Sequence, residues 1–171
     1  KRTFEFIGLI LISTSIGLAI AFTTYSPEDP SFIYGDREFE IKNFFGIYGS
    51  SIADFLLQSF GLVSFLILAN FLFWGINLIF QKEIKRIFLK LFLVVSYLIL
   101  GTIFIYITFN NSFWLIDNGN SGFVGKVGYE FLSNWFPYID NTYSAYGLLL
   151  LTLIFFIFSA DLNIKKIISG T

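Results

Sequence analysis

Four long apolar runs without a single charged residue constrain this chain more than any other feature. They cover residues 6–24, 60–80, 91–109 and 143–160. As α-helices, with about 1.5 Å of rise per residue, the runs are roughly 27–32 Å long, which matches a bilayer hydrocarbon core of about 30 Å. Strands of a membrane barrel would instead alternate polar and apolar residues over about ten positions. The runs therefore predict an all-α membrane protein with four transmembrane helices.

The composition agrees and removes several kinds of chemistry. Of 171 residues, 56% are hydrophobic and 13% are charged, whereas a soluble domain has about 25% charged residues. The net charge of −1 excludes a strongly basic surface for nucleic acids over the chain as a whole. The sequence has no Cys and no His, which excludes disulfides, thiol or imidazole catalysis and Cys/His metal sites. It also has no Met, so we expect Lys1 to lie inside a longer natural chain.

The distribution of charge predicts the orientation in the membrane. The N-terminus, the second connection and the C-terminal tail hold 8 of the 11 basic residues, whereas the other two connections hold 9 of the 12 acidic residues. By the positive-inside rule, both termini are cytoplasmic and the two long connections lie outside. A cleavable signal peptide is the alternative interpretation of the first run, because two basic residues precede it and Ala19-Ile20-Ala21 resembles a cleavage site.

These signals divide the chain into eight segments of one membrane domain. The transmembrane helices are expected at 4–24, 59–80, 91–109 and 143–160. An inner loop is expected at 81–90 and a cytoplasmic tail at 161–171. The segments 25–58 and 110–142 should each contain an outer loop and a short interfacial helix.

The two outer segments resemble each other at an offset of 76 residues. Gly46 and Gly49 align with Gly122 and Gly125, Asp54 aligns with Glu130, and a Phe-Leu pair follows each acid. The chain is therefore predicted to contain two parallel repeats, each built from a membrane helix, an outer amphipathic interfacial helix and a returning membrane helix.

Few side chains are candidates for chemistry. Asp54 and Glu130 could form a pair of catalytic acids, but we favour a role near the start of an interfacial helix, where a carboxylate suits the helix dipole. Asn70 and Asn77 share a helix face and are expected to hydrogen-bond a neighbouring helix. None of the four runs contains an ionisable residue, which disfavours a proton-coupled transporter or an ion pump.

Small residues on the first helix form a separate stripe. Ser13, Gly17 and Ala21 are spaced to let another helix approach closely, whether from this chain or from another copy.

No nucleotide site is expected. Gly125-Lys126 resembles the end of a phosphate-binding loop, but Asn120 and Val127 stand where Gly and Ser or Thr are required.

Two motifs in the first half carry a resemblance to a known family. The segment after the first run contains Ser26, Pro27, Asp29 and Pro30, and the entry to the second run contains Gly46, Gly49, Ala53 and Asp54. With the four-span layout and Gly122/Gly125, this resembles the N-terminal membrane domain of the FtsK/SpoIIIE-type bacterial DNA translocases. The resemblance covers nearly the whole chain. The chain departs from the family in its Phe/Ile-rich, Ala-poor composition and its longer third connection.

The resemblance implies a membrane anchor in the bacterial inner membrane, at the division septum, that contacts other division proteins and self-associates, since the family's motor is a hexamer. DNA, ATP and Mg²⁺ would be bound only by a motor beyond Thr171, and no cofactor or catalytic residue is expected in this segment. Two alternatives stay open: a small four-span transporter or channel, with Asn70 and Asn77 on its path, or a membrane enzyme that uses Asp29, Asp54 or Glu130 at the outer face.

Overall fold

The described part of the computed structural model is helical throughout. It comprises residues 2–32, 41–80, 84–112, 114–115 and 117–162. The elements in these ranges are α1 (Arg2–Thr23), α2 (Gly46–Phe60), the 3-10 helix η1 (Gly61–Val63), α3 (Ser64–Phe80), α4 (Ile87–Phe109), α5 (Gly122–Ser133) and α6 (Thr142–Ser159).

Within the described ranges, four helical segments are long and apolar enough to cross a membrane. They are Arg2–Thr23, Gly46–Phe80, Ile87–Phe109 and Thr142–Ser159. The second of these includes α2, but the chain bends at η1, where Gly61 has a φ of 56° that favours glycine. The predicted all-α architecture with four transmembrane helices is therefore confirmed.

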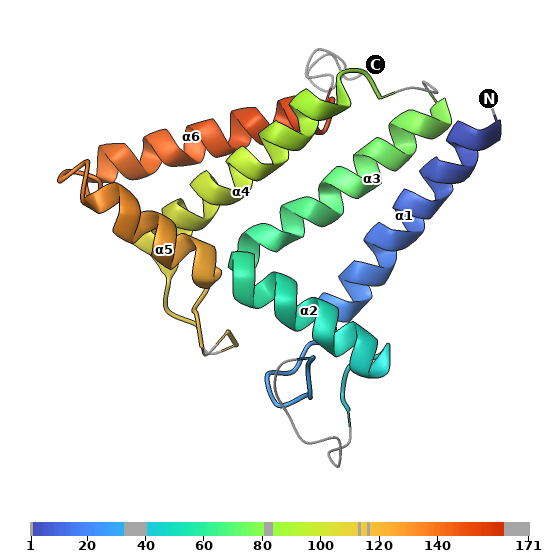
Figure 1. Cartoon of the computed structure of the whole chain (residues 1–171), viewed down its shortest axis with the longest axis horizontal. Helices are drawn as coiled ribbons and strands as arrows, with labels where there is room; N and C mark the ends of the chain where they lie inside the picture. The colour runs from blue at the N-terminus through green and yellow to red at the C-terminus, as the bar shows by residue number, and fades with distance from the viewer. Residues whose placement is uncertain (1, 33–40, 81–83, 113, 116, 163–171) are drawn as a thin grey trace.

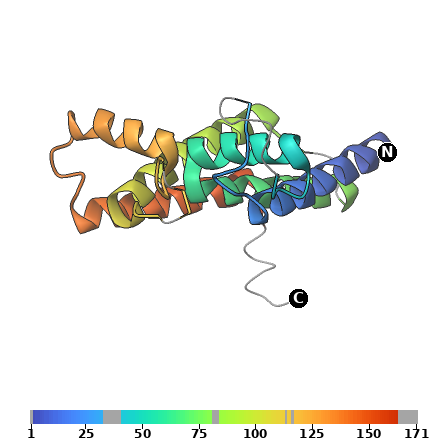
Figure 2. The ribbon, with the colours of Figure 1, turned by 90° about the horizontal axis from the view of Figure 1, so that it is seen from below.

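The helices form two halves of the same design. In the first half α1 packs along α3, and in the second half α4 packs along α6. The short helices α2 and α5 follow one another across one end of the bundle, here called the α2–α5 end (Figure 1). Viewed from below, the molecule is flat and elongated, with α1 at one extreme and the turn between α5 and α6 at the other (Figure 2).

The two repeats share the way in which their short helices begin. Gly46 and Gly122 start α2 and α5 at equivalent positions, and both have positive φ angles, of 61° and 67°. Just before each glycine, an asparagine side chain binds the end of the preceding long helix. Asn43 Nδ2 donates to the carbonyl oxygen of Ala21 at 2.9 Å, and Asn120 Nδ2 donates to that of Phe109 at 2.8 Å. The repeat thus extends to backbone geometry and to the capping of helix ends.

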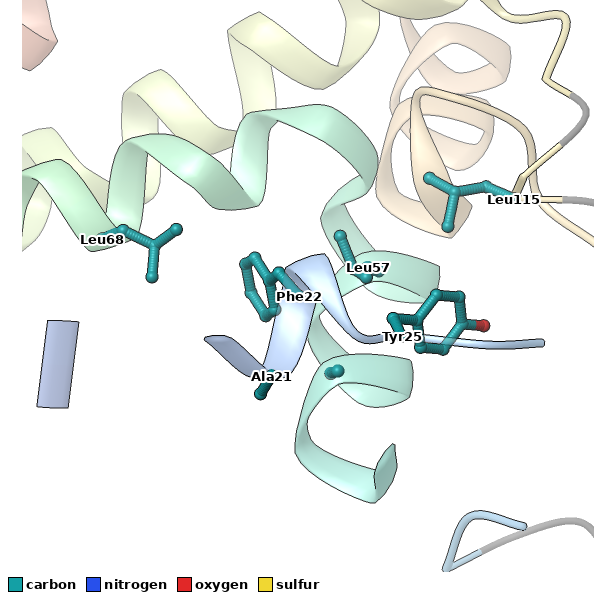
Figure 3. Packing of buried hydrophobic residues seen from close by; sticks show 7 residues of the cluster. Ala21, Phe22, Tyr25, Leu57, Leu68 and Leu115 are labelled. Carbon is teal, nitrogen blue, oxygen red and sulfur yellow. The ribbon is translucent and has the colours of Figure 1, made fainter. Parts of the chain in front are cut away.

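The largest buried cluster lies where the first half meets the α4–α5 connection. Figure 3 shows Phe22 and Tyr25 beside Leu57 of α2, with Leu68 of α3 on one side and Leu115 on the other. Phe22, Leu57 and Leu115 are fully buried. Because Leu115 belongs to the second half of the chain, this cluster also holds the two halves together.

Two glycines outside the predicted stripe let α1 and α3 approach each other closely. A Cβ on Gly8 would lie 2.7 Å from the carbonyl oxygen of Gly75, and a Cβ on Gly75 would lie 2.7 Å from that of Gly8. In the stripe of small residues, only Ala21 is buried. Ser13 is exposed, and a Cβ on Gly17 would meet nothing within 4 Å. The helix contact within this chain therefore lies on a different face of α1.

The third long helix begins one turn earlier than the sequence predicts. α4 starts at Ile87, not at residue 91, so Lys90 lies inside it and is 5% exposed. The cost of burying this ammonium group is offset because Lys90 Nζ pairs with the carboxylate of Asp161, beyond the end of α6. The predicted helices at 4–24 and 143–160 agree with α1 and α6 to within two residues. The predicted helix at 59–80 begins five residues before α3, because the end of α2 and η1 occupy residues 59–63. The predicted tail lies largely outside the described residues.

Candidate functional site at the α2–α5 end

Three residues of the two motifs, Pro27, Asp29 and Asp54, line a cavity of about 610 Å³ at the α2–α5 end. We call this cavity the α2 cleft. Its walls come from the loop after α1, from α2, from the α4–α5 connection and from α5. The polar residues that line it include Asp29, Ser31, Asp54, Gln58, Ser59, Asp117 and Asn118, and Pro27, Phe55 and Phe123 also contribute. Segments that are distant in the sequence thus meet in one polar hollow.

A chain of hydrogen bonds through Tyr25 connects three residues that line the cleft, Asp54, Gln58 and Asn118. The hydroxyl of Tyr25 donates to Asp54 Oδ1 at 2.9 Å, and Gln58 Nε2 donates to that hydroxyl at 3.2 Å. Asn118 Nδ2 then donates to Gln58 Oε1 at 2.9 Å. These bonds tie the end of α1 and the α4–α5 connection to α2, so the cleft has fixed walls.

Tyr25 is the centre of this arrangement. Its side chain is 7% exposed, and its ring packs edge-on against that of Trp114, with 5.6 Å between centroids. Burial raises the pKa of the Tyr25 hydroxyl, and the adjacent Asp54 carboxylate acts in the same direction. The hydroxyl is therefore neutral at ordinary pH and acts as a hydrogen-bond donor.

The other residues of the first motif shape the loop beside the cleft. The Asp29 carboxylate accepts hydrogen bonds from the backbone N–H groups of Lys42 and Asn43, at 2.9 and 2.8 Å. The Pro30 carbonyl accepts a 2.6 Å hydrogen bond from Ser50 Oγ, and Ser26 Oγ accepts a 3.4 Å bond from a backbone N–H two residues on. Pro27 is exposed at the rim.

The second motif explains how α2 can lie so close to that loop. A Cβ on Gly49 would lie 2.1 Å from Asn43 Oδ1, and Ala53 is fully buried. In the second repeat, a Cβ on Gly125 would lie 2.6 Å from the carbonyl oxygen of Thr102 in α4. At each position, a larger side chain would push a short helix away from its support.

The structure does not bring the two repeat-related acids together. The predicted role near the start of an interfacial helix is wrong, since neither acid lies in the first turn of its helix and each is the ninth residue. Asp54 lines the cleft, whereas Glu130 is exposed on α5 and is not among the residues that line it. Among the described residues, the acids that share the cleft with Asp54 are Asp29 and Asp117. Among the described residues, no group of three or more His, Cys, Asp or Glu side chains is arranged to hold a metal ion.

The predicted asparagines face the second half of the chain. Asn70 Nδ2 donates to the Tyr97 hydroxyl at 2.7 Å, and Asn70 Oδ1 accepts from Ser159 Oγ at 3.1 Å. Asn77 Nδ2 donates to the carbonyl oxygen of Ala160 at 3.4 Å. Both side chains therefore join helices, and Asn70 is only 2% exposed.

Sequence reasoning missed the side chains that organise the cleft. Sequence patterns predict no role in this cleft for Tyr25, Asn43 or Asn118. Gln58 carried a signal, since it lies one turn after Asp54 and aligns with an amide in the second repeat, Asn134. The partners of these residues lie 22 to 60 positions away along the chain, where local patterns give no information.

Comparisons with known proteins place the chain in one family. A model of the 4TM region of DNA translocase FtsK/SpoIIIE matches residues 1–170. The DNA translocase FtsK of Rickettsia typhi is 37% identical over 92 residues, which are 54% of this chain and 12% of the relative. The DNA translocase FtsK of Azospirillum brasilense is 31% identical over 86 residues, 50% of this chain and 14% of the relative.

The matched part is thus a small share of each relative, and no solved structure matches the chain. The family model covers all four predicted spans and both repeats. The resemblance carried by the motifs after α1 and in α2 is therefore correct. The chain belongs to the family of four-helix membrane regions of the DNA translocases FtsK and SpoIIIE.

Proposed function

We propose that this domain anchors an FtsK-like DNA translocase in the inner membrane at the division septum and so couples chromosome segregation to cell division. The family supports the connection to a translocase. The observation that carries the anchoring role is that the start of α1 and the end of α6 lie at the same end of the bundle, opposite α2 and α5 (Figure 1). A motor attached after α6 would then share the compartment of the N-terminus.

The charge distribution supports placing that compartment in the cytoplasm. Lys85, Arg86 and Lys90 lie between α3 and α4 or at the start of α4, on the same side as the ends of α1 and α6. DNA, ATP and Mg²⁺ would be bound by the motor, beyond Thr171. The part of the chain described here would contribute lipid contacts, self-association and binding of other division proteins.

The orientation can be tested directly because the sequence has no cysteine. Single Asn118→Cys and Lys85→Cys variants of the full-length protein should react differently with a membrane-impermeant maleimide in intact cells. We expect the cysteine at position 118 to be labelled and that at position 85 to be labelled only after permeabilisation. The reverse pattern would refute the cytoplasmic placement of the motor.

The septal role needs a separate experiment. A fluorescent fusion of residues 1–171 should concentrate at mid-cell in dividing bacteria. A fusion in which the first motif is disrupted by Asp29→Ala should remain in the membrane but lose part of its enrichment, because Asp29 holds the loop beside the cleft. Even distribution of the unmodified fusion around the cell would contradict the proposal.

The enzyme alternative receives little support from the geometry. The Asp29 carboxylate already accepts two backbone hydrogen bonds, and that of Asp54 accepts one from Tyr25. Glu130, the third candidate, lies on a different surface. A transporter is equally disfavoured, since the side chains of Asn70 and Asn77 form hydrogen bonds with Tyr97 and Ala160 that join helices, and so do not line a path for a substrate. The hydrogen bonds of these four residues thus hold loops and helices in place, which is the role expected in a structural scaffold.

A further inference from the structure

A second, smaller cavity adjoins the α2 cleft. It has a volume of about 250 Å³ and shares Ser31, Asp54 and Phe55 with the cleft. Its other walls are mainly apolar, and Ser51 of α2 also lines it. Asp54 therefore stands between a polar hollow and an apolar one, an arrangement that suits a ligand with both a polar and an apolar part.

The polar hollow is negatively charged. Asp117 is exposed, and its carboxylate makes no hydrogen bond or ion pair with any described residue. No described Lys or Arg lines either cavity. The two connections that form this end of the molecule, residues 25–58 and 110–142, carry three basic and nine acidic residues. The charge of the hollow is thus complementary to a cation.

Exposed aromatic rings stand beside these carboxylates. Phe55 is 62% exposed and Phe123 is 56% exposed, and both line the cleft. An arginine or lysine side chain that entered between α2 and α5 could place its charge near Asp54 and Asp117 while its alkyl stem packs on a ring.

An unsatisfied group in the apolar hollow independently indicates a ligand. Ser51 is 2% exposed, and its Oγ is the one buried side-chain oxygen or nitrogen among the described residues without a hydrogen-bond partner. A buried hydroxyl without a hydrogen-bond partner makes the protein without ligand less stable than it would be if the hydroxyl were hydrogen-bonded. A polar group inserted beside Ile52 and Phe55 would remove that deficit.

We infer that the α2 cleft docks a basic segment of a partner polypeptide, with a Lys or Arg side chain on Asp54 and Asp117 and a neighbouring side chain in the cavity lined by Ser51. The inference rests on the proposed function, since it specifies the chemistry of a partner that the anchor would bind. A polypeptide is favoured over a sugar because the hollow combines three carboxylates, lined by no described Lys or Arg, with a separate apolar cavity.

The test uses the full-length protein in nanodiscs of zwitterionic lipid. The probes are short fluorescent peptides that carry Arg or Lys beside Trp, and matched peptides with Gln in place of each basic residue. We expect saturable binding of the basic peptides that weakens as salt is raised. Asp54→Asn combined with Asp117→Asn should weaken binding about two- to 25-fold, since each exposed charge pair contributes a factor of about 1.4–5.

Controls separate docking from folding and from nonspecific attraction. Asp54→Asn keeps an oxygen that can accept the Tyr25 hydrogen bond, and equal thermal stability of the variant would show that the fold is intact. Glu130→Gln removes the repeat-related charge on α5 and should leave binding unchanged. Ser51→Ala should weaken binding without lowering the stability of the free protein.

Three outcomes would overturn the inference. They are absence of binding by every basic peptide, equal binding by the Gln peptides, and equal weakening in Glu130→Gln. Displacement of the peptides by a chito-oligosaccharide that itself binds would assign the cleft to glycan. The assay does not depend on cellular location, so its failure leaves the septal anchor standing, and failure of the fusion experiment leaves the cleft to be judged by the peptides.

Discussion

Gly61 and Gly122 meet at the joint between the two halves of the bundle. A Cβ on Gly122 would lie 2.6 Å from the backbone nitrogen of Gly61, and both residues have positive φ angles. Beside them, the Leu62 N–H donates to the carbonyl oxygen of Asn120 at 2.8 Å. At these glycines the end of α2 thus meets the start of α5 backbone to backbone, and no side chain larger than hydrogen fits at either position.

Gly122→Ala should therefore destabilise the domain by about 2–4 kcal/mol, from the strained backbone and the forced separation of the halves. Gly46→Ala is the matched control. It has the equivalent position and a φ of 61°, but a Cβ there meets nothing within 4 Å, so only about 1–2 kcal/mol is expected. Thermal unfolding of both variants in detergent measures the difference, and equal losses would mean that the contact with Gly61 contributes nothing.

A second matched pair tests which face of α1 packs within the chain. Gly75→Ala should destabilise by about 1–3 kcal/mol because its Cβ would lie 2.6 Å from Ile12 Cγ1. Gly17→Ala should be neutral or stabilise by up to about 1 kcal/mol, since it gains helix propensity in open space. A loss of assembly without a loss of monomer stability in Gly17→Ala would instead reveal a contact with another copy.

The hydrogen bond between Asn70 and Tyr97 should couple the two halves by about 0.6–1.7 kcal/mol, the range for such bonds inside membrane proteins. The measurement is a double-mutant cycle with Asn70→Leu and Tyr97→Phe. We expect Tyr97→Phe to lower the stability of the unmodified protein by more than it lowers the stability of the Asn70→Leu variant. Strict additivity of the two losses would show that this bond contributes nothing to stability.

Alkaline pH should destabilise the domain through Tyr25. Burial raises the pKa of this hydroxyl above the ordinary tyrosine value of about 10. A raised folded-state pKa means that its contribution to stability is complete below about pH 10 and is lost as the pH rises further. The free energy of unfolding should therefore fall more steeply above about pH 10 in the unmodified protein than in Tyr25→Phe. Parallel pH profiles would assign the loss to other tyrosines.

Local sequence patterns predicted the elements well because each depends on neighbouring residues. The four apolar runs became α1, α3, α4 and α6, and the alignment of Gly46 with Gly122 corresponds to two helices that start in the same way. The predicted bounds were wrong at the start of α3, where the end of α2 and η1 occupy residues 59–63. They were also wrong at α4, which begins three residues before Lys90 and matches the charge with Asp161. A residue 71 positions away decided that boundary.

The sequence by itself determined that this chain is a four-helix membrane domain in two parallel repeats, because hydrophobic length, charge placement and repeated glycines are local or periodic properties. Only the tertiary structure decided that Asp54 meets Tyr25, Gln58 and Asp117 in one cleft and that Glu130 does not. The physical reason is that α2 and α5 are joined end to end by their glycines, so their equivalent faces point to different neighbours. Equivalence in sequence therefore did not produce equivalence of surroundings.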